Sequence, residues 1–117
     1  MKITVAICTW NRAELLDRTL GEMIGLRVPE GVEWELLVID NNSTDDTENV
    51  VAGFEGRLPV RHVFEPRAGK SHAANTVLRE ARGDLIVWTD DDVLVDAGWL
   101  EAYAHAARDW PDAALFI

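Results

Sequence analysis

The chain has 117 residues, of which 48% are hydrophobic, and it carries 11 Lys and Arg against 21 Asp and Glu for a formal net charge of −10. This length suits one domain with its own core and is too short for two. The acidic field repels nucleic acid and anionic lipid, so no nucleic-acid partner is expected. An anionic ligand would need local help from a cation, a helix N-terminus or a few placed basic side chains.

Cys8 is the only cysteine, which excludes an intrachain disulfide and a cysteine zinc cluster and favours a cytoplasmic setting. It lies in an apolar run, so a buried strand residue is a better interpretation than a catalytic thiol. No apolar stretch approaches the ~18 residues of a membrane span. Any contact of the full-length protein with a membrane is therefore expected to be peripheral.

Short apolar runs alternate with helix-periodic segments from end to end, which is typical of a parallel sheet covered by helices. The sequence predicts the α/β class, with a Rossmann-like, mostly parallel sheet and helices on both faces. The predicted strands cover residues 3–8, 35–39, 60–64, 84–89 and 113–117.

Four helices are predicted between the strands, and cap residues mark their ends. Asn11 is well placed as the N-cap of the first helix, Ser43 or Thr44 as that of the second, and Gly83 as a left-handed residue after the third. The fourth helix begins near Gly98. Helical spacing predicts that these side chains face the sheet: Leu16, Leu20, Met23, Ile24, Val50, Val51, Phe54, Ala74, Val77, Leu78, Ala81, Trp99, Leu100, Tyr103, Ala107 and Trp110.

The predicted strand at 113–117 is followed by no turn, cap or polar tail. We therefore interpret residues 1–117 as one incomplete domain, truncated after its fifth strand. An uncovered apolar edge strand offers its free N–H and C=O groups to another chain. This predicts self-association through the terminal strand.

Polar side chains gather where three predicted strands end. Residues 9–12 follow the first strand, Asp40 follows the second, and residues 90–92 follow the fourth. Ligands of open parallel sheets bind beyond the carboxyl ends of the strands. These residues are therefore expected to share one rim.

Three adjacent acids, Asp90, Asp91 and Asp92, form the strongest signal. Adjacent carboxylates repel one another unless a cation neutralises them. Mg²⁺ and Mn²⁺ take oxygen ligands and keep waters and substrate phosphates in their shell. In an extended segment Asp90 and Asp92 point to the same side, so they are the candidate metal ligands. The alternative is a solvated acidic loop.

Asp40 and a basic loop before the third helix complete the candidate site. A carboxylate at a strand tip can accept hydrogen bonds from a ribose or a base, and Lys70 or Arg67, with the helix start, can approach a pyrophosphate. The alternatives are loop capping for Asp40 and solvated charges for the loop. His62 and His72 are interpreted as surface residues. The lack of a glycine-rich fingerprint after the first two strands argues against a dinucleotide enzyme and a P-loop NTPase.

Four sequence blocks occur in order along the chain: residues 5–12 (VAICTWNR), 37–47 (LVIDNNSTDDT), 69–75 (GKSHAAN) and 83–92 (GDLIVWTDDD). Together they resemble the family-two glycosyltransferases, whose nucleotide-sugar-binding domain has the GT-A fold. The resemblance implies an Asp-x-Asp metal motif with Asp90 and Asp92 as ligands. The nucleotide-binding residues that it implies are Thr9, Asn11, Arg12, Asp40, Lys70, Asn75, Asp90 and Asp91.

The function implied by this resemblance is binding of a nucleotide-diphosphate sugar through Mn²⁺ or Mg²⁺, for inverting transfer to a saccharide or lipid-linked acceptor. The metal would assist departure of the nucleotide as a Lewis acid. The sequence differs from the family pattern in two ways that bear on function. Asn41 stands where many members carry a second acid, so the nucleoside contact is expected to differ here. The general base of the family is expected beyond Ile117, so no catalytic residue is assigned and this chain alone is expected to be inactive.

Two other interpretations stay open. A sugar nucleotidyltransferase also uses metal-bound aspartates on an α/β sheet, but it would need a basic, glycine-rich N-terminal loop, and residues 9–12 contain one Arg and no glycine. A non-catalytic nucleotide-binding or interaction module would bind its ligand without turnover. Stoichiometric binding without product distinguishes the module from an enzyme.

Overall fold

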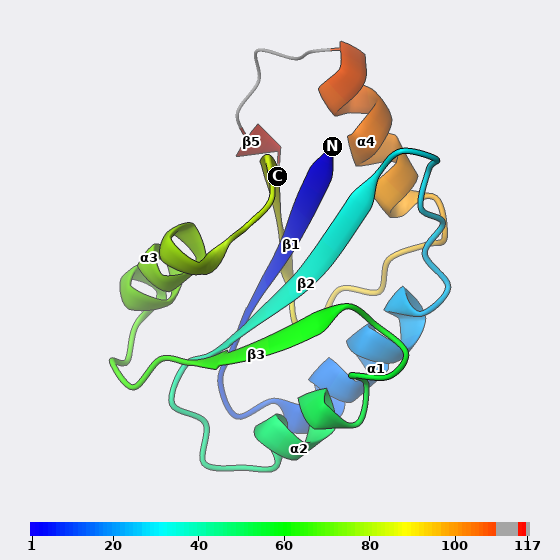
Figure 1. Cartoon of the computed structure of the whole chain (residues 1–117). Coiled ribbons are helices and arrows are strands. Elements are labelled where there is room, and N and C mark those ends of the chain that lie inside the picture. Colours follow the sequence, from blue (N-terminus) through cyan, green and yellow to red (C-terminus); the bar gives the residue numbers. More distant parts are fainter. Residues whose placement is uncertain (110–114, 117) are drawn as a thin grey trace.

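The computed structural model describes residues 1–109 and 115–116, which form a five-stranded sheet with helices on both faces (Figure 1). The strand order is β3-β2-β1-β4-β5 and every neighbouring pair is parallel, which confirms the predicted fold class. The strands are β1 Lys2–Thr9, β2 Glu33–Asp40, β3 Val60–Phe64, β4 Leu85–Asp90 and β5 Leu115–Phe116, and the helices are α1 Ala13–Met23, α2 Thr47–Ala52, α3 Lys70–Glu80 and α4 Trp99–Asp109.

The two faces of the sheet carry cores of different size. Helices α1, α2 and α4 cover one face (Figure 1), where Leu16, Val51 and Leu100 belong to the larger apolar cluster. Helix α3 covers the opposite face, and its Ala73 and Val77 belong to the smaller cluster. Among the described residues no helix is long and apolar enough to span a membrane.

The register of the sheet brings the ends of three strands to one rim. Thr9 of β1 pairs with Asp40 of β2, and Cys8 of β1 pairs with Asp90 of β4. The central strand β1 anchors this rim, because its residues from Ile3 to Ile7 are fully buried. The rim predicted from the strand ends is therefore present, and it lies at the carboxyl edge of the sheet, where ligands of this architecture bind.

The predicted inward faces of the helices are mostly correct, with two errors. Ile24 is 43% exposed because α1 ends at Met23, and Leu78 is 64% exposed because α3 turns its neighbours Thr76 and Val77 toward the sheet instead. Successive helical residues point about 100° apart, so Leu78 is directed outward. Four residues that the predictions include, Trp110, Ala113, Ala114 and Ile117, lie outside the described residues, and self-association through the terminal strand remains a prediction.

The predicted caps of α1 and α2 are wrong, because the side chains concerned bond across to a neighbouring loop. Arg12 is the N-cap residue of α1, and Asn11 Oδ1 instead accepts the backbone N–H of Thr44 at 2.7 Å. Ser43 Oγ accepts the backbone N–H of Asn11 at 2.9 Å. Asp45 supplies the acceptors that the helices lack, because its two carboxylate oxygens take the N–H groups of the first residues of α1 and α2 at 3.1 and 3.2 Å.

Gly83 has a different role from the left-handed helix end that the sequence predicts. Helix α3 ends at Glu80, and the described glycines with positive φ are Gly31 and Gly69. At Gly83 an added Cβ would lie 2.6 Å from the backbone nitrogen of Thr4. The glycine is therefore required because the chain entering β4 passes directly against β1.

This close approach predicts that Gly83→Ala is destabilising. Backbone of the central strand cannot move away cheaply, so we expect a loss of about 1–3 kcal/mol, as for overpacking in a filled core. Gly21→Ala is the matched control, since nothing lies within 4 Å of its Cβ position, and a helical alanine there should add about 0.5–1 kcal/mol. Urea unfolding measures both. Equal midpoints for the two variants would contradict this account of Gly83.

Candidate functional site

The middle aspartate of the acidic run is buried and holds the turn after β4 in place. Asp91 is 5% exposed, and its carboxylate oxygens accept a hydrogen bond from Thr9 Oγ1 at 2.8 Å and one from Arg12 Nη1 at 3.3 Å. Its backbone carbonyl accepts the hydroxyl of Thr19 of α1 at 2.7 Å. The structure thus brings three of the predicted site residues, Thr9, Arg12 and Asp91, into direct contact. It uses Asp91 to fasten the acidic turn to β1 and α1.

The flanking acids Asp90 and Asp92 are exposed. Among the described residues the carboxylate of Asp90 has no hydrogen-bond or ion-pair partner, and that of Asp92 has only Arg12, with Nη1 3.7 Å from Oδ2. The strand ends at Asp90 and the next two residues form a turn, so the prediction that an extended backbone carries both side chains is wrong at Asp92. Both carboxylates are nonetheless free to take a ligand.

The donor set fits a hard divalent cation that is only partly held by protein. No group of three or more Asp, Glu, His or Cys side chains among residues 1–109 and 115–116 lies close enough to hold a metal. Mg²⁺ and Mn²⁺ do not need one, because they are commonly bound by one or two carboxylates and complete their shell with waters and phosphate oxygens. Asp90 and Asp92 supply two such carboxylates, and their role as metal ligands remains a prediction.

Cys8 lies beside these acids, and its thiol stays protonated. Partial burial, and then the negative charges of Asp90 and Asp91, raise the pKa of the Cys8 thiol to about 11. The thiolate is the reactive form of cysteine. The structure confirms that Cys8 is a strand residue, although it is partly rather than fully buried, and gives no support to a catalytic thiol.

Asp40 is buried at the end of β2 and already has two partners. Its Oδ1 accepts the backbone N–H of Ser43 at 2.9 Å, and its Oδ2 is hydrogen-bonded to His62 Nε2 at 2.9 Å. Asp40 therefore does cap the loop after β2, which was the alternative to a binding role. Each of its carboxylate oxygens can still accept a second hydrogen bond, so a ligand can bind there as well. The interpretation of His62 as a surface residue is wrong, because its side chain is 16% exposed and held by Asp40. His72 is likewise half-buried.

Another buried carboxylate, Glu65, follows β3 and was not among the predicted site residues. Glu65 is 3% exposed, and it accepts hydrogen bonds from Arg67 through the backbone N–H, Nε and Nη2 and from the hydroxyl of Thr76 at 2.7 Å. Hydrogen bonds from Arg67 and then from Thr76 lower the pKa of the Glu65 carboxyl to about 2. The signal was available in the sequence, since Glu65 directly follows a strand as Asp40 and Asp90 do.

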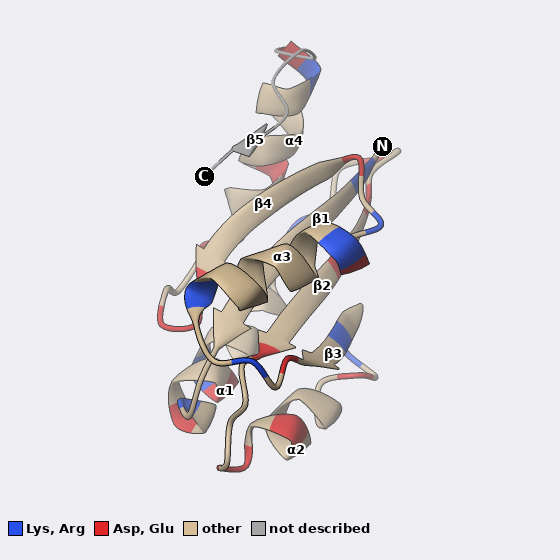
Figure 2. Cartoon of the chain, turned by 90° about the vertical axis from the view of Figure 1, so that its left-hand side faces the viewer, with Lys and Arg blue, Asp and Glu red and all other residues tan. Residues whose placement is uncertain are grey.

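The basic loop begins with this contact and leads into α3. Arg67 and Lys70 are exposed, Lys70 is the first residue of α3, and Asn75 is exposed on the same helix. Figure 2 shows the basic residues at the start of α3 and in the loop before it. Neither Lys70 nor Asn75 has a side-chain hydrogen bond to another described residue. The structure therefore leaves both available for a ligand but does not bring Asn75 into contact with the acidic turn.

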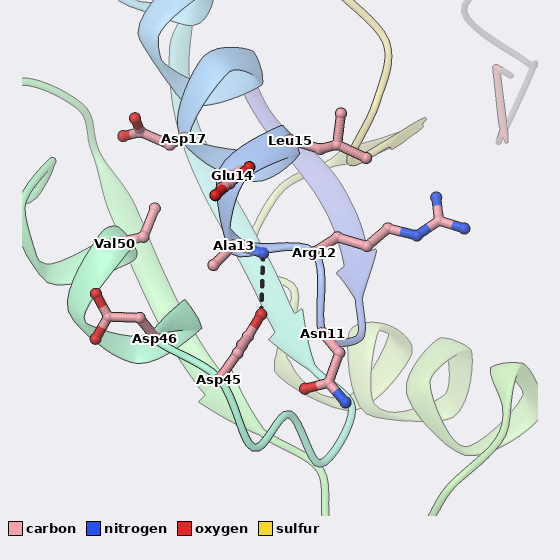
Figure 3. A pocket seen from close by; sticks show the side chains of 9 residues that line it. All are labelled: Asn11, Arg12, Ala13, Glu14, Leu15, Asp17, Asp45, Asp46 and Val50. Carbon is pink, nitrogen blue, oxygen red and sulfur yellow. Dashed lines mark hydrogen bonds between the residues drawn. The ribbon is translucent and has the colours of Figure 1, made fainter.

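An open hollow between the starts of α1 and α2 borders the rim but does not suit a phosphate. Its lining includes Glu14, Asp17, Asp45 and Asp46, and Asp45 is occupied by the N–H of the first residue of α1 (Figure 3). Figure 3 also shows the side chain of Arg12 directed away from these acids. Four carboxylates repel a diphosphate, so the rim at the strand ends is the better site for an anionic ligand.

Comparison with known proteins identifies this arrangement. The family model described as Glycosyl transferase family 2 matches residues 4–117. The chain belongs to glycosyl transferase family 2. It is 38% identical to validoxylamine A glucosyltransferase of Streptomyces hygroscopicus over 109 residues, which cover 89% of this chain and 25% of that protein. It is 30% identical to the succinoglycan biosynthesis protein ExoM of Rhizobium meliloti over 117 residues, which cover 98% of this chain and 38% of that protein.

Solved structures of the same type confirm the GT-A-like fold. The mannosyltransferase PcManGT of Pyrobaculum calidifontis, solved with GDP-Man and Mn²⁺, superposes with a TM-score of 0.76 at 34% identity, covering 95% of this chain and 32% of that one. TarS of Staphylococcus aureus superposes with a TM-score of 0.83 at 23% identity, covering 93% of this chain and 33% of that one, and shows the fold alone. The chain thus spans about a third of each of these two solved chains.

The low pKa of Glu65 predicts a pH-dependent contribution to stability. The pKa of this carboxyl falls from 4.5 to about 2 on folding, so its stabilising effect is complete above pH 4.5 and is lost as the pH falls toward 2. The difference in urea midpoint between the wild type and Glu65→Gln should therefore be largest near neutral pH and smallest near pH 2. Glu55→Gln, an exposed position, is the control and should differ little from the wild type. A Glu65→Gln difference that is constant with pH would contradict the assignment.

Proposed function

We propose that this chain forms the donor site of a glycosyltransferase and binds a nucleotide-diphosphate sugar through Mn²⁺ or Mg²⁺ at the rim of β1, β2 and β4. The observation that carries the proposal is the pair of exposed carboxylates, Asp90 and Asp92, on either side of a buried Asp91 whose two carboxylate oxygens are both hydrogen-bonded by protein. In this run of three acids the protein hydrogen-bonds only the middle carboxylate, and the single Arg12 cation lies near Asp91 and Asp92, so negative charge is left over for a divalent cation. The presence of GDP-Man and Mn²⁺ in the related mannosyltransferase structure supports this choice of ligand.

The phosphate end of the donor is assigned to the acidic turn and the basic loop. Asp90 and Asp92 hold the cation, which supplies positive charge to the departing diphosphate when bound. We assign Lys70 and the backbone N–H groups at the start of α3 to the same diphosphate, as a fixed positive region. Arg12, already paired with Asp91 and near Asp92, adds a further cation. These groups overcome the net charge of −10 locally.

The nucleoside end is assigned to the neighbouring strand ends. Asp40 keeps acceptor capacity for a ribose hydroxyl or a base N–H beside Thr9 and Asn11. We also assign to the ligand Asn75, which is exposed on α3. Trp10 is exposed directly after β1. An exposed indole ring can stack on a base or a sugar, so we add Trp10 to this end of the site.

In the whole protein we assign this site to inverting transfer of the sugar to a saccharide or lipid-linked acceptor. Inversion in one displacement requires a general base that takes the proton of the acceptor hydroxyl. The proposal gives the residues described here the tasks of binding and orienting the donor and of stabilising the leaving group. We assign none of them as the base.

Calorimetric titration of the chain with UDP, GDP and dTDP, with and without Mn²⁺, tests the proposal. We expect one of these nucleotides to bind only with Mn²⁺, and Asp92→Asn to weaken it at least about tenfold, because a metal held by two carboxylates loses one of them. Asp109→Asn, which removes the same charge at the end of α4, should leave the affinity unchanged. Metal-independent binding, or equal affinities for the two variants, would contradict the proposed site.

A further inference from the structure

Asn41, the first residue after β2, fastens the basic loop to the rim through three side-chain hydrogen bonds. Its Nδ2 donates to the carbonyl of Arg67 at 2.7 Å and to that of Glu65 at 3.3 Å, and its Oδ1 accepts the N–H of Gly69 at 3.0 Å. One side chain therefore bonds three backbone groups within five residues of loop. A backbone bond from Glu65 N–H to the carbonyl of Asp40 at 2.8 Å ties the start of the same loop to the same strand end.

These contacts require an amide. Two of the three partners of Asn41 are carbonyl oxygens, which need a donor, and the third is an N–H group, which needs an acceptor. A carboxylate at this position keeps the acceptor but places a negative oxygen against two carbonyl oxygens. The amide faces the loop and makes three hydrogen bonds there.

The loop is braced at its other side by Glu65. The buried carboxylate of Glu65 holds Arg67 at the start of the loop and Thr76 in α3. Between these two braces the chain turns through Gly69, whose φ of 121° is open to glycine and strained for other residues, and α3 begins at the next residue, Lys70. The position of Lys70 and of the free N–H groups at the start of α3 thus depends on Asn41 and Glu65 together.

We propose that Asn41 is a positioning residue for donor binding: it sets the loop that presents Lys70 and the start of α3 to the diphosphate, and it does not itself contact the nucleoside. The inference rests on the proposed function of the rim. It assigns Asn41 to the phosphate end of the donor, although Asn41 is adjacent in sequence to Asp40 at the nucleoside end. Loss of Asn41 therefore lowers the affinity for a nucleoside diphosphate more than the affinity for the corresponding nucleoside.

The test compares Asn41→Asp and Asn41→Ala with Asn42→Asp. Asn42 is exposed, its side chain makes no hydrogen bond to another described residue, and its φ of 67° suits Asp as well as Asn, so this variant adds the same charge one residue away and breaks no bond. Titration with UDP, GDP and dTDP in the presence of Mn²⁺, and with the matching nucleosides, gives the affinities. Hydrogen exchange of the Gly69 N–H reports the loop in the absence of any nucleotide.

Both Asn41 variants should lower the affinity for the diphosphate that the wild type binds by about tenfold, as expected for the loss of two or three hydrogen bonds that preorganise a site. Asn42→Asp should change it by less than about twofold. Nucleoside affinity should be unaltered in all three, and Gly69 exchange should accelerate in the Asn41 variants alone.

The possible failures are distinguishable. If the wild type binds none of the diphosphates, the proposed function fails and the inference fails with it. If the wild type binds but the Asn41 variants match Asn42→Asp, or lose nucleoside and diphosphate affinity equally, the positioning role is wrong while the donor site stands. Unchanged exchange at Gly69 in Asn41→Ala would show that Asn41 does not hold the loop.

Discussion

Asp91 is buried just after β4, where Thr9 Oγ1 and Arg12 Nη1 donate hydrogen bonds to its carboxylate and the Thr19 hydroxyl donates one to its carbonyl. A buried carboxylate without such donors would cost several kcal/mol or take up a proton. The contact therefore does two things at once. It connects β4 to β1 and α1 at the rim, and it turns the neighbouring acids, Asp90 and Asp92, to solvent.

The same division between satisfied and free charges runs along the whole rim. Asp40 is bonded by His62 and a backbone N–H, and Glu65 is bonded by Arg67 and Thr76. The buried acids thus act as internal braces that shape the loops after β2, β3 and β4. The carboxylates of the exposed acids at the end of β4 have no hydrogen-bond donor from the described residues, and their one ion pair is the 3.7 Å contact between Arg12 and Asp92. A chain with excess negative charge can hold an anionic donor because a cation can be placed where those free acids lie.

Sequence periodicity was sufficient for the parallel sheet, for the helices on both faces and for the rim, because apolar runs and their spacing record burial directly. Prediction from the sequence failed where a side chain contacts a residue that is distant along the chain. The sequence predicts Asn11 as a helix N-cap, but its side chain accepts a hydrogen bond from Thr44. It predicts Gly83 as a left-handed helix end, but the glycine is required because Thr4 lies too close for a Cβ atom. Such contacts join segments that are 30 or more residues apart, as the Asn11–Thr44 bond does with a separation of 33, and no local pattern encodes them.

The candidate site shows the same limit. The acidic run and Asp40 were visible because acids that directly follow apolar strands are unusual, and Glu65 satisfies the same criterion. What the sequence could not supply was the assignment of tasks among adjacent acids. Burial separates Asp91 from Asp90 and Asp92, and the orientation of an amide toward three backbone groups separates Asn41 from Asp40. Both distinctions depend on the packing of loops that meet only in the folded chain.

Anomalous diffraction from crystals of the chain grown with Mn²⁺ and the nucleoside diphosphate that it binds tests the central claim most directly, because it locates the metal without reference to activity. The account predicts a manganese peak between the carboxylates of Asp90 and Asp92, with the diphosphate on its far side toward Lys70. A peak in the acidic hollow beside Asp45 and Asp46, or ordered nucleotide without manganese at the end of β4, would contradict it.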